Sequence, residues 1–153
     1  MKKLLYFSFI IISLCLASCS QQKKESYFKE PLFTTDDTIK VLSMTEGWLE
    51  KVKNKEIREA CDFLYNLENE GLAKYSESQI QALEQQFATF PVLSYKLLNM
   101  TWNNPYDVTL QYSYEFFEKN PEDNIPNTMN IVFRPQKRNK MWYLNVEKKS
   151  VIQ

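Results

Sequence analysis

The spacing of the apolar residues changes once along the chain, at Pro91, and this change limits the folds that the chain can adopt. Before Pro91, apolar side chains recur every three or four residues, which is typical of amphipathic helices. After Pro91 they alternate with polar side chains, which indicates strands with one buried and one exposed face. Helices followed by strands predict an α+β fold in which N-terminal helices pack on a roughly four-stranded antiparallel sheet.

The first helix is expected to begin near Thr34 or Thr35. Either hydroxyl can accept a hydrogen bond from the unpaired N–H groups of the first turn, and Asp36 and Asp37 suit the positive end of the helix dipole. Gly47 interrupts this helix and should weaken it by about 1 kcal/mol relative to alanine.

A second helix is expected after Asn54 and a third after Ser76. The second carries an apolar stripe at helical spacing, formed by Ile57, Ala60, Cys61 and Leu64. Because Cys61 lies within this stripe, we interpret it as a small buried apolar residue and not as a redox thiol. Ser76 and Gln79 have the spacing of a capping box, and Pro91 ends the third helix because it cannot donate the next backbone hydrogen bond.

Four strands are expected over residues 92–102, 108–116, 128–134 and 142–147. The second is the clearest, because its residues alternate strictly between apolar (Val108, Leu110, Tyr112, Tyr114 and Phe116) and polar (Thr109, Gln111, Ser113 and Glu115). Polar connections at 103–105 and 120–127 and a basic turn at 135–140 separate the strands. Short connections of this kind predict an antiparallel meander.

The start of the chain has the layout of a secretory signal. Lys2 and Lys3 precede an uncharged, mostly apolar run of 14 residues, 4–17. At about 1.5 Å per residue, this run is too short to cross roughly 30 Å of hydrocarbon as a helix. It ends in Leu16-Ala17-Ser18-Cys19, which resembles the lipobox of bacterial lipoproteins. The resemblance implies cleavage between Ser18 and Cys19, a diacylglyceryl thioether on Cys19 and acylation of its new amine with a fatty acid such as palmitate.

This resemblance divides the chain into a signal peptide (1–18), a tether (19–33) and one α+β domain (34–153). Two or three acyl chains hold a protein on a membrane almost permanently. Ser20, and not an aspartate, follows Cys19, which in the sorting rule of enterobacterial lipoproteins favours the outer membrane. We therefore expect a lipid-anchored protein of the cell envelope on the periplasmic face of the outer membrane, with the inner membrane and the cell surface as alternatives.

Composition excludes several kinds of site. The chain contains no histidine, which excludes a His-based catalytic triad, a His-ligated metal and a His pH switch. Removal of residues 1–18 leaves 17 Lys and Arg against 19 Asp and Glu, so no basic excess indicates nucleic acid binding. Cys15 leaves with the signal and Cys19 is lipidated, so Cys61 has no partner for an intramolecular disulfide. No metal-ligand cluster or phosphate-binding loop is visible, and we expect no metal or cofactor.

The order of the elements also resembles a protein family. A long helix, a Lys-Asn-Lys-Glu break at 53–56, two further helices and four strands ending in Trp142-Tyr143-Leu144 are similar to the small NTF2-like (cystatin-like) lipoproteins of bacteria. The resemblance covers roughly residues 35–150 and implies a cone of sheet and helices that can hold a ligand. Enzymatic members carry an Asp/His or Tyr/Asp site in the cone, whereas the corresponding strand positions here are Tyr, Leu, Phe and Trp.

Three functions are open at this point. The first, which we favour, is a membrane-anchored, non-catalytic binding module for a small apolar or amphipathic ligand. Its candidate ligand-binding residues are Tyr95, Trp102, Tyr112, Tyr114 and Trp142, each of which could instead fill the core. The second is a protein-interaction subunit of an envelope assembly, using the polar sheet face and the basic turn (Arg134, Lys137, Arg138 and Lys140). The third is an NTF2-like isomerase or dehydratase, for which no catalytic residues are visible.

The lipobox interpretation gives a direct test. Replacing Cys19 by serine removes the thiol that receives the lipid, so the Cys19→Ser precursor should stay uncut and unlabelled by radioactive fatty acid. Ala17→Gly keeps a small residue before the cleavage site and should be processed normally. Normal processing and fatty acid labelling of Cys19→Ser would contradict the lipoprotein assignment.

Overall fold

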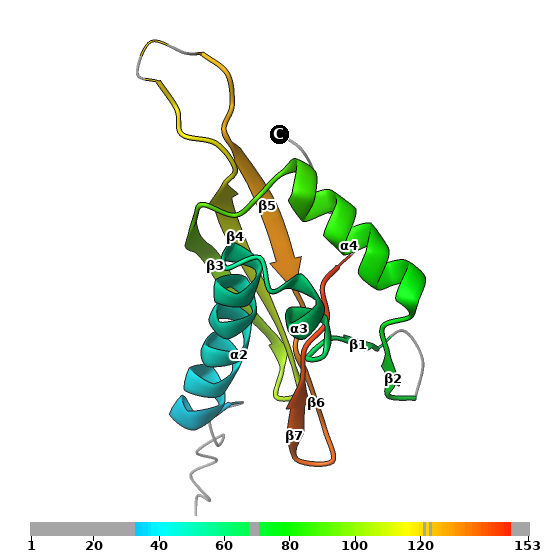
Figure 1. Cartoon of the computed structure of the whole chain (residues 1–153). Helices are drawn as coiled ribbons and strands as arrows, with labels where there is room; N and C mark the ends of the chain where they lie inside the picture. The colour runs from blue at the N-terminus through cyan, green and yellow to red at the C-terminus, as the bar shows by residue number, and fades with distance from the viewer. Residues whose placement is uncertain (1–32, 68–70, 121, 123, 148–153) are drawn as a thin grey trace, which may run out of the picture. The chain divides into compact units, whose positions relative to one another are not determined.

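The computed structural model describes residues 33–67, 71–120, 122 and 124–147 (Figure 1). The predicted signal peptide, Cys19 and all of the tether except Phe33 lie outside these residues. Within the described part of the chain, no helix is both long enough and apolar enough to span a bilayer.

The second part of the described chain folds into one antiparallel sheet of five strands. Its strands are β3 (Ser94–Asn104), β4 (Asp107–Glu115), β5 (Thr128–Phe133), β6 (Gln136–Arg138) and β7 (Met141–Tyr143). β4 pairs with β3 along one edge and with both β5 and β6 along the other. Strands β5 and β6 therefore follow one another in a single strand position, interrupted near Pro135, which has no N–H to donate. The predicted α+β fold with about four strand positions is confirmed.

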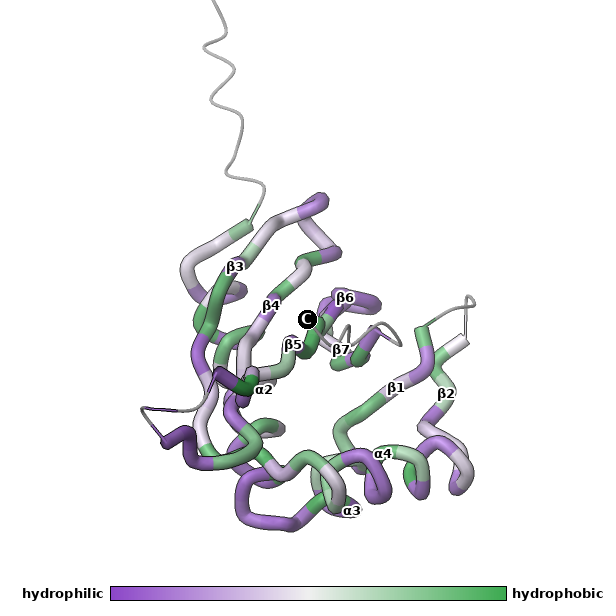
Figure 2. The backbone as a smooth tube through the Cα atoms, turned by 90° about the horizontal axis from the view of Figure 1, so that it is seen from above, coloured by the Kyte–Doolittle hydropathy of each residue, from purple (hydrophilic) through white to green (hydrophobic). Residues whose placement is uncertain are grey.

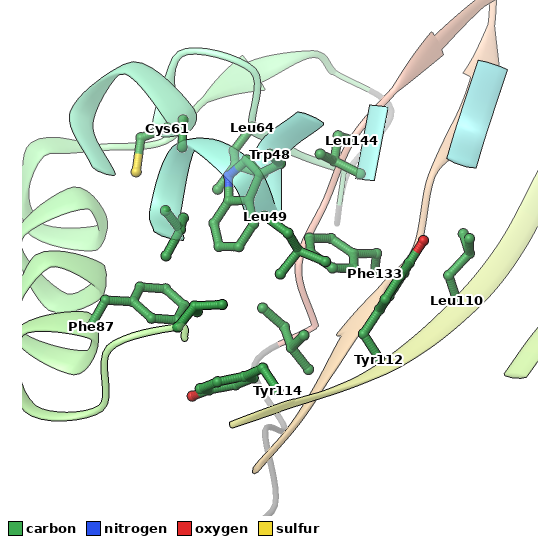
Figure 3. Packing of buried hydrophobic residues seen from close by; sticks show 14 of the residues in the cluster. Trp48, Leu49, Cys61, Leu64, Phe87, Leu110, Tyr112, Tyr114, Phe133 and Leu144 are labelled. Atoms are coloured by element: carbon green, nitrogen blue, oxygen red, sulfur yellow. The ribbon is translucent and has the colours of Figure 1, made fainter. Parts of the chain in front are cut away.

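The alternation predicted for 108–116 sets which face of the sheet is buried. Val108, Leu110, Tyr112 and Tyr114 are all buried on β4. The last three pair with β5 in register, with Leu110 opposite Phe133. Hydrophobic and hydrophilic positions follow one another along the strands in Figure 2. The buried face packs against helix side chains such as Trp48 and Phe87, which lie in the same cluster (Figure 3). Burial of this face is the main stabilising contribution to the fold.

Helix α2 (Thr35–Lys53) begins with a capping box. The Asp37 N–H donates to the Thr34 hydroxyl at 3.1 Å, and the Thr34 N–H donates to the Asp37 carboxylate at 3.3 Å. The helix passes through Gly47 without a break, so the predicted interruption is wrong, because neighbouring residues of α2 are held in the core. The helix ends at Lys53 with Asn54 as its C-cap, and Lys55 follows in the left-handed region with φ 66°.

Helix α3 (Ile57–Cys61) is shorter than its apolar stripe predicts. The chain leaves the helix after Cys61 because the Tyr65 N–H donates to the Leu144 carbonyl oxygen at 2.8 Å. This bond lies next to a short hairpin that the sequence did not predict, formed by β1 (Tyr65–Asn66) and β2 (Ala73–Lys74). Helix α4 (Glu77–Thr89) begins with the predicted Ser76 capping box and ends just before Pro91, as expected.

The basic segment 135–140 is only partly a turn. Residues 136–138 form β6, which pairs with β7, so the prediction of a turn over all six residues is wrong. The reversal is confined to Asn139 and Lys140, which have φ values of 50° and 66°. Two consecutive residues with positive φ form the tight hairpin turn whose twist suits antiparallel strands.

Asp37 joins the first described helix to the last hairpin. Its carboxylate, which caps α2, also accepts hydrogen bonds from Lys137 Nζ at 2.6 Å and from Trp142 Nε1 at 2.9 Å. The Lys137 ammonium is the largest of the influences that hold the pKa of Asp37 well below its ordinary value near 3.8. These bonds connect residues 100 and 105 positions apart in the sequence.

The Asp37 contacts predict acid sensitivity. A carboxylate whose pKa is lowered by folding contributes stability that is present above its unfolded pKa, near 3.8, and is lost as the pH falls below that value. Asp37→Asn should lower the free energy of unfolding at neutral pH by about 1–3 kcal/mol and reduce its pH dependence below about pH 4. Denaturant titrations at neutral and acid pH measure both effects.

Asp36→Asn is the matched control, because Asp36 occupies the same first turn and is exposed. It should change the free energy of unfolding by less than about 0.5 kcal/mol. Equal effects of the two substitutions would show that Asp37 acts only through the helix dipole.

Candidate functional site

A cavity of about 550 Å³ opens between α2, the segment after α3 and the last hairpin. We call it the aromatic cleft, and its lining residues are Ser43, Met44, Gly47, Trp48, Lys51, Asp62, Phe63, Tyr65, Met141, Trp142, Tyr143 and Leu144. Its size lies within the usual range for small-molecule sites, and most of its lining is apolar or aromatic, as in such sites.

Helix α2 supplies one wall of the cleft. Met44, Gly47, Trp48 and Lys51 are spaced so that they share one helix face. A Cβ added at Gly47 would meet no atom within 4 Å, so the absence of a side chain there leaves open space beside the helix backbone. Gly47 is unfavourable for the helix, but its lack of a side chain enlarges the cleft.

Trp48 forms the buried base of that wall. Its ring is 1% exposed and packs edge-on against Phe133 at 5.3 Å and Phe87 at 5.7 Å between ring centres. Its Nε1 is buried and has no hydrogen-bond acceptor among the described residues. Packing alone therefore fixes the ring.

The opposite wall comes from the segment after α3 and from β7. The rings of Tyr65 and Tyr143 meet edge to face at 4.9 Å, and the Lys74 ammonium lies 4.0 Å from the centre of the Tyr65 ring. At the rim, Phe63 is 55% exposed and Met141 is 54% exposed. Two large apolar side chains exposed beside an apolar cavity are typical of a binding site.

The charged groups of the cleft do not form an acid–base pair. Lys51 Nζ lies 2.9 Å from Glu59 and 3.3 Å from Glu56, and these carboxylates raise the pKa of Lys51. A lysine that acts as a base or nucleophile needs a lowered pKa, so Lys51 is suited to pairing and not to proton transfer. Asp62, the other charged lining residue, is exposed.

The five aromatic residues proposed from the sequence are divided among three places. Tyr112 and Tyr114 are buried in the core (Figure 3). The Tyr112 hydroxyl lies 3.0 Å from that of Thr45, the Tyr114 hydroxyl lies 3.5 Å from the Met129 sulfur, and burial raises the pKa of both tyrosines. Their hydroxyls are thus partnered inside the core and do not face the aromatic cleft.

Tyr95 and Trp102 lie on β3, half-buried and away from the cleft lining. Burial, and next the hydrogen bond to Glu50 at 2.8 Å, raise the pKa of Tyr95. The Trp102 ring stacks on Phe33 with 4.2 Å between ring centres and meets Trp142 edge to face at 5.7 Å. Trp142 alone of the five lines the cleft, where its Nε1 bond to Asp37 orients the ring.

Sequence reasoning missed most of the cleft. Gly47 next to Trp48 was the available signal, because an isolated glycine inside a helical pattern often has a packing or functional reason. Phe63, Tyr65 and Met141 gave no signal, since their position depends on the unpredicted β1–β2 hairpin and on the exact place of the last turn.

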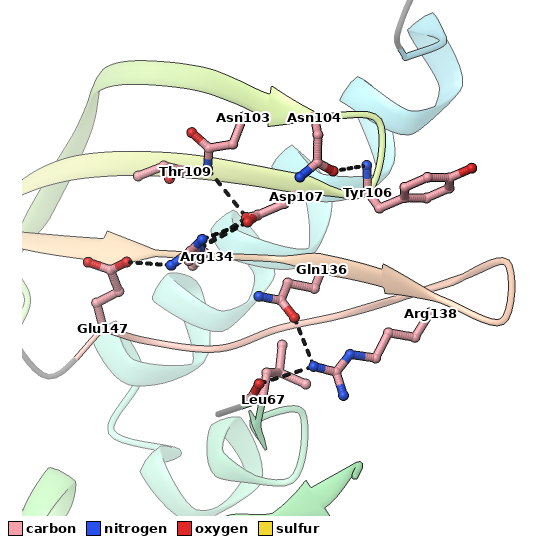
Figure 4. A network of polar contacts seen from close by, with 10 residues as sticks. All are labelled: Leu67, Asn103, Asn104, Tyr106, Asp107, Thr109, Arg134, Gln136, Arg138 and Glu147. Atoms are coloured by element: carbon pink, nitrogen blue, oxygen red, sulfur yellow. Dashed lines mark hydrogen bonds and ion pairs between the residues drawn. The ribbon is translucent and has the colours of Figure 1, made fainter. Parts of the chain in front are cut away.

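The basic turn considered as a partner surface is largely engaged within the domain (Figure 4). Arg134 makes a two-pronged contact with Asp107, with its shortest bond at 2.7 Å. Lys137 pairs with Asp37, and Arg138 donates to the carbonyl oxygens of Leu67 and Gly71. Of the four basic residues in that segment, Lys140 is the exposed one at the hairpin turn.

A second cavity, of about 300 Å³, lies between α4, β5 and the segment that follows β7. Gln79, Leu83, Gln86, Ile131 and Glu147 are among its lining residues. It is smaller than the aromatic cleft and has a single aromatic side chain, Tyr75, whose hydroxyl donates to Asn145 at 3.0 Å.

Comparisons with known proteins add little to this geometry. No family model matches the chain, and no curated protein matches it. The crystal structure of an NTF-2 like protein of unknown function from Shewanella oneidensis MR-1 is similar at a TM-score of 0.48 and 9% sequence identity, covering 71% of this chain and 93% of that chain. A likeness at this level assigns neither family nor function, and the α+β architecture rests on the helices and strands described above.

Cys61 offers a test of the site description. Cys61 is the last residue of α3 and its thiol is buried, and burial raises the pKa of this thiol to about 11. The rate of its reaction with a thiol reagent should still be rising steeply at about pH 10 in the folded protein, whereas in denaturant it should be half-maximal near pH 9.0 and close to its plateau at about pH 10. Cys61→Ala supplies the background rate. Fast labelling of the folded protein at neutral pH would show an accessible, reactive thiol instead.

Proposed function

We propose that this protein is a lipid-anchored, non-catalytic binding module of the bacterial cell envelope that takes an apolar or amphipathic ligand into the aromatic cleft. The observation that carries the proposal is the cleft itself, about 550 Å³ in volume and lined mainly by aromatic and methionine side chains. The anchor is the lipid on Cys19, and the proposed location is the periplasmic face of the outer membrane.

Apolar contact, and not charge, would select the ligand. Lys51 is already paired with Glu56 and Glu59, so it offers little net attraction to an anionic group. Met44 and Met141 have flexible, polarizable side chains that adapt to ligands of different shape. The rings of Tyr65 and Tyr143 provide flat apolar surface with a hydroxyl at one edge, which suits a ligand with both apolar and polar parts.

We further propose that the domain belongs to the NTF2-like lipoproteins that the sequence resembles. The support is the order of the elements, with helices α2, α3 and α4 before the antiparallel strands and Trp142-Tyr143-Leu144 at the last strand.

Gly47 allows the cleft to be blocked without disturbing the core. Because a Cβ at this position meets no atom within 4 Å, Gly47→Leu should extend into the cleft while the helix gains stability. The mature, lipidated protein, purified from its own envelope, should carry a bound small molecule in native mass spectrometry. Gly47→Leu should lose that molecule and should also lose the blue-shifted fluorescence of added anilinonaphthalene sulfonate.

Gly47→Ala is the matched control, since it adds one methyl group and should keep both signals. Thermal unfolding should occur at an equal or higher temperature in both variants, with a gain of up to about 1 kcal/mol for alanine. A bound molecule that persists in Gly47→Leu, or a wild-type protein that carries none and does not bind the dye, would contradict the proposal.

The exposure of Phe63 and Met141 at the rim favours a second candidate, an envelope protein that inserts an apolar side chain into the same cleft. In cells, a photo-crosslinking residue at Phe63 would then join the lipoprotein to a protein of defined mass. Gly47→Leu should abolish that crosslink, while Gly47→Ala should retain it.

A further inference from the structure

The start of α2 and two hairpin turns lie together at one end of the domain, the end at which Phe33 enters (Figure 1). Lys137 accounts for this arrangement. Its side-chain ammonium binds the Asp37 carboxylate in the first turn of α2 at 2.6 Å. Its backbone N–H donates to the carbonyl oxygen of Tyr106, in the β3–β4 turn, at 2.7 Å. The β6–β7 turn, at Asn139 and Lys140, follows directly. We call this the Phe33 end.

Each of the three segments exposes a large apolar side chain at this end. Ile39 on α2 is 61% exposed, Tyr106 in the β3–β4 turn is 62% exposed, and Met141 beside the β6–β7 turn is 54% exposed. The Tyr106 ring points beyond the ends of the strands (Figure 4). All three segments therefore leave a large apolar side chain uncovered at this end.

The charges at the Phe33 end suit an anionic surface. Lys40 and Lys140 are exposed next to Ile39 and next to Met141, and Asp36 is the exposed acidic residue nearby. The other local carboxylates are paired, Asp37 with Lys137 and Asp107 with Arg134. Lysine side chains beside apolar ones suit a lipid interface, where the ammonium reaches the phosphates while the stem stays among apolar groups.

The opposite end of the domain has the reverse charge. Among the described residues of the β4–β5 connection, Glu118 and Glu122 are exposed together with Lys119, and Glu115 ends β4 just before it. The nine residues of β4, at about 3.3 Å each, place this connection roughly 30 Å from the Tyr106 turn. The domain therefore has a basic, partly apolar end and an acidic end.

The tether joins the domain at the Phe33 end, so along the chain this end is the closer one to the anchor. The chain from Cys19 to Phe33 has 14 peptide links, which span at most about 50 Å. Phe33 is held on the domain by its stacking on Trp102. A surface too weak to bind lipid alone is then held close to the bilayer, at an effective concentration on the order of millimolar.

We propose that the Phe33 end, through Ile39, Tyr106 and Met141 with Lys40 and Lys140, docks on the phospholipid surface to which the chain is anchored. The inference rests on the lipid anchor of the proposed function and does not require a ligand in the aromatic cleft, although Met141 belongs to both surfaces. Tyrosine is a common residue at membrane interfaces, where its ring and hydroxyl match the two environments.

Ile39 and Ile125 provide a matched pair for the test. Both are 61% exposed isoleucines, one at the Phe33 end and one in the β4–β5 connection. In the mature, lipidated chain, Ile39→Cys and Ile125→Cys would each carry a fluorophore, because buried Cys61 reacts slowly. On vesicles of phosphatidylethanolamine and phosphatidylglycerol that contain spin-labelled lipid, the probe at 39 should be quenched several-fold more than the probe at 125.

A second set of variants separates docking from simple proximity. With the probe at Tyr106→Cys, the substitution Met141→Glu should reduce quenching towards the level of the 125 probe, whereas Ile125→Glu should leave it unchanged. Protein that floats with the vesicles but shows equal quenching at 39 and 125, or no effect of Met141→Glu, would overturn the docking inference alone. Protein that does not float with the vesicles would overturn the anchor and the docking inference together.

Discussion

The Asp37 carboxylate is the interaction on which the arrangement of this domain depends. It caps the first turn of α2 and binds both Lys137 and Trp142 in the last hairpin. Because both of its long-range partners are donors, and one is a full cation, the negative charge is stabilised although the side chain is mostly covered. The start of α2 and the β6–β7 hairpin are thereby held together.

The aromatic cleft is a consequence of that connection. Its two walls are α2 and the last hairpin, and the Asp37–Trp142 bond sets how these elements meet. Space remains between them because Gly47 has no side chain on the facing surface of the helix. Tyr112 and Tyr114 fill the core on the buried face of α2, whereas the neighbouring face of the same helix, which carries Gly47, borders an open cavity.

The basic residues of the segment 134–138 bind groups of the domain itself, which leaves fewer charged side chains to bind other molecules. Arg134, Lys137 and Arg138 bind carboxylates or carbonyl oxygens of the domain itself. Two surfaces of the described domain remain for partners: the apolar cleft with Phe63 at its rim, and the Phe33 end, where Ile39 and Tyr106 lie near the exposed Lys40 and Lys140. Met141 belongs to both, so a ligand in the cleft and a bilayer at that end would meet at this side chain.

The sequence by itself determined the features that depend on neighbouring residues. Thr34 and Ser76 cap their helices with groups three positions away, and alternation along β4 decides which of its faces is buried. Only the tertiary structure decided which distant groups meet. The hydrogen bond from Tyr65 to the Leu144 carbonyl oxygen ends α3 early, and Lys137 and Trp142 both bind Asp37. The cleft lies where Gly47 faces the last hairpin. Such contacts join residues tens of positions apart, and one sequence carries no local pattern that specifies them.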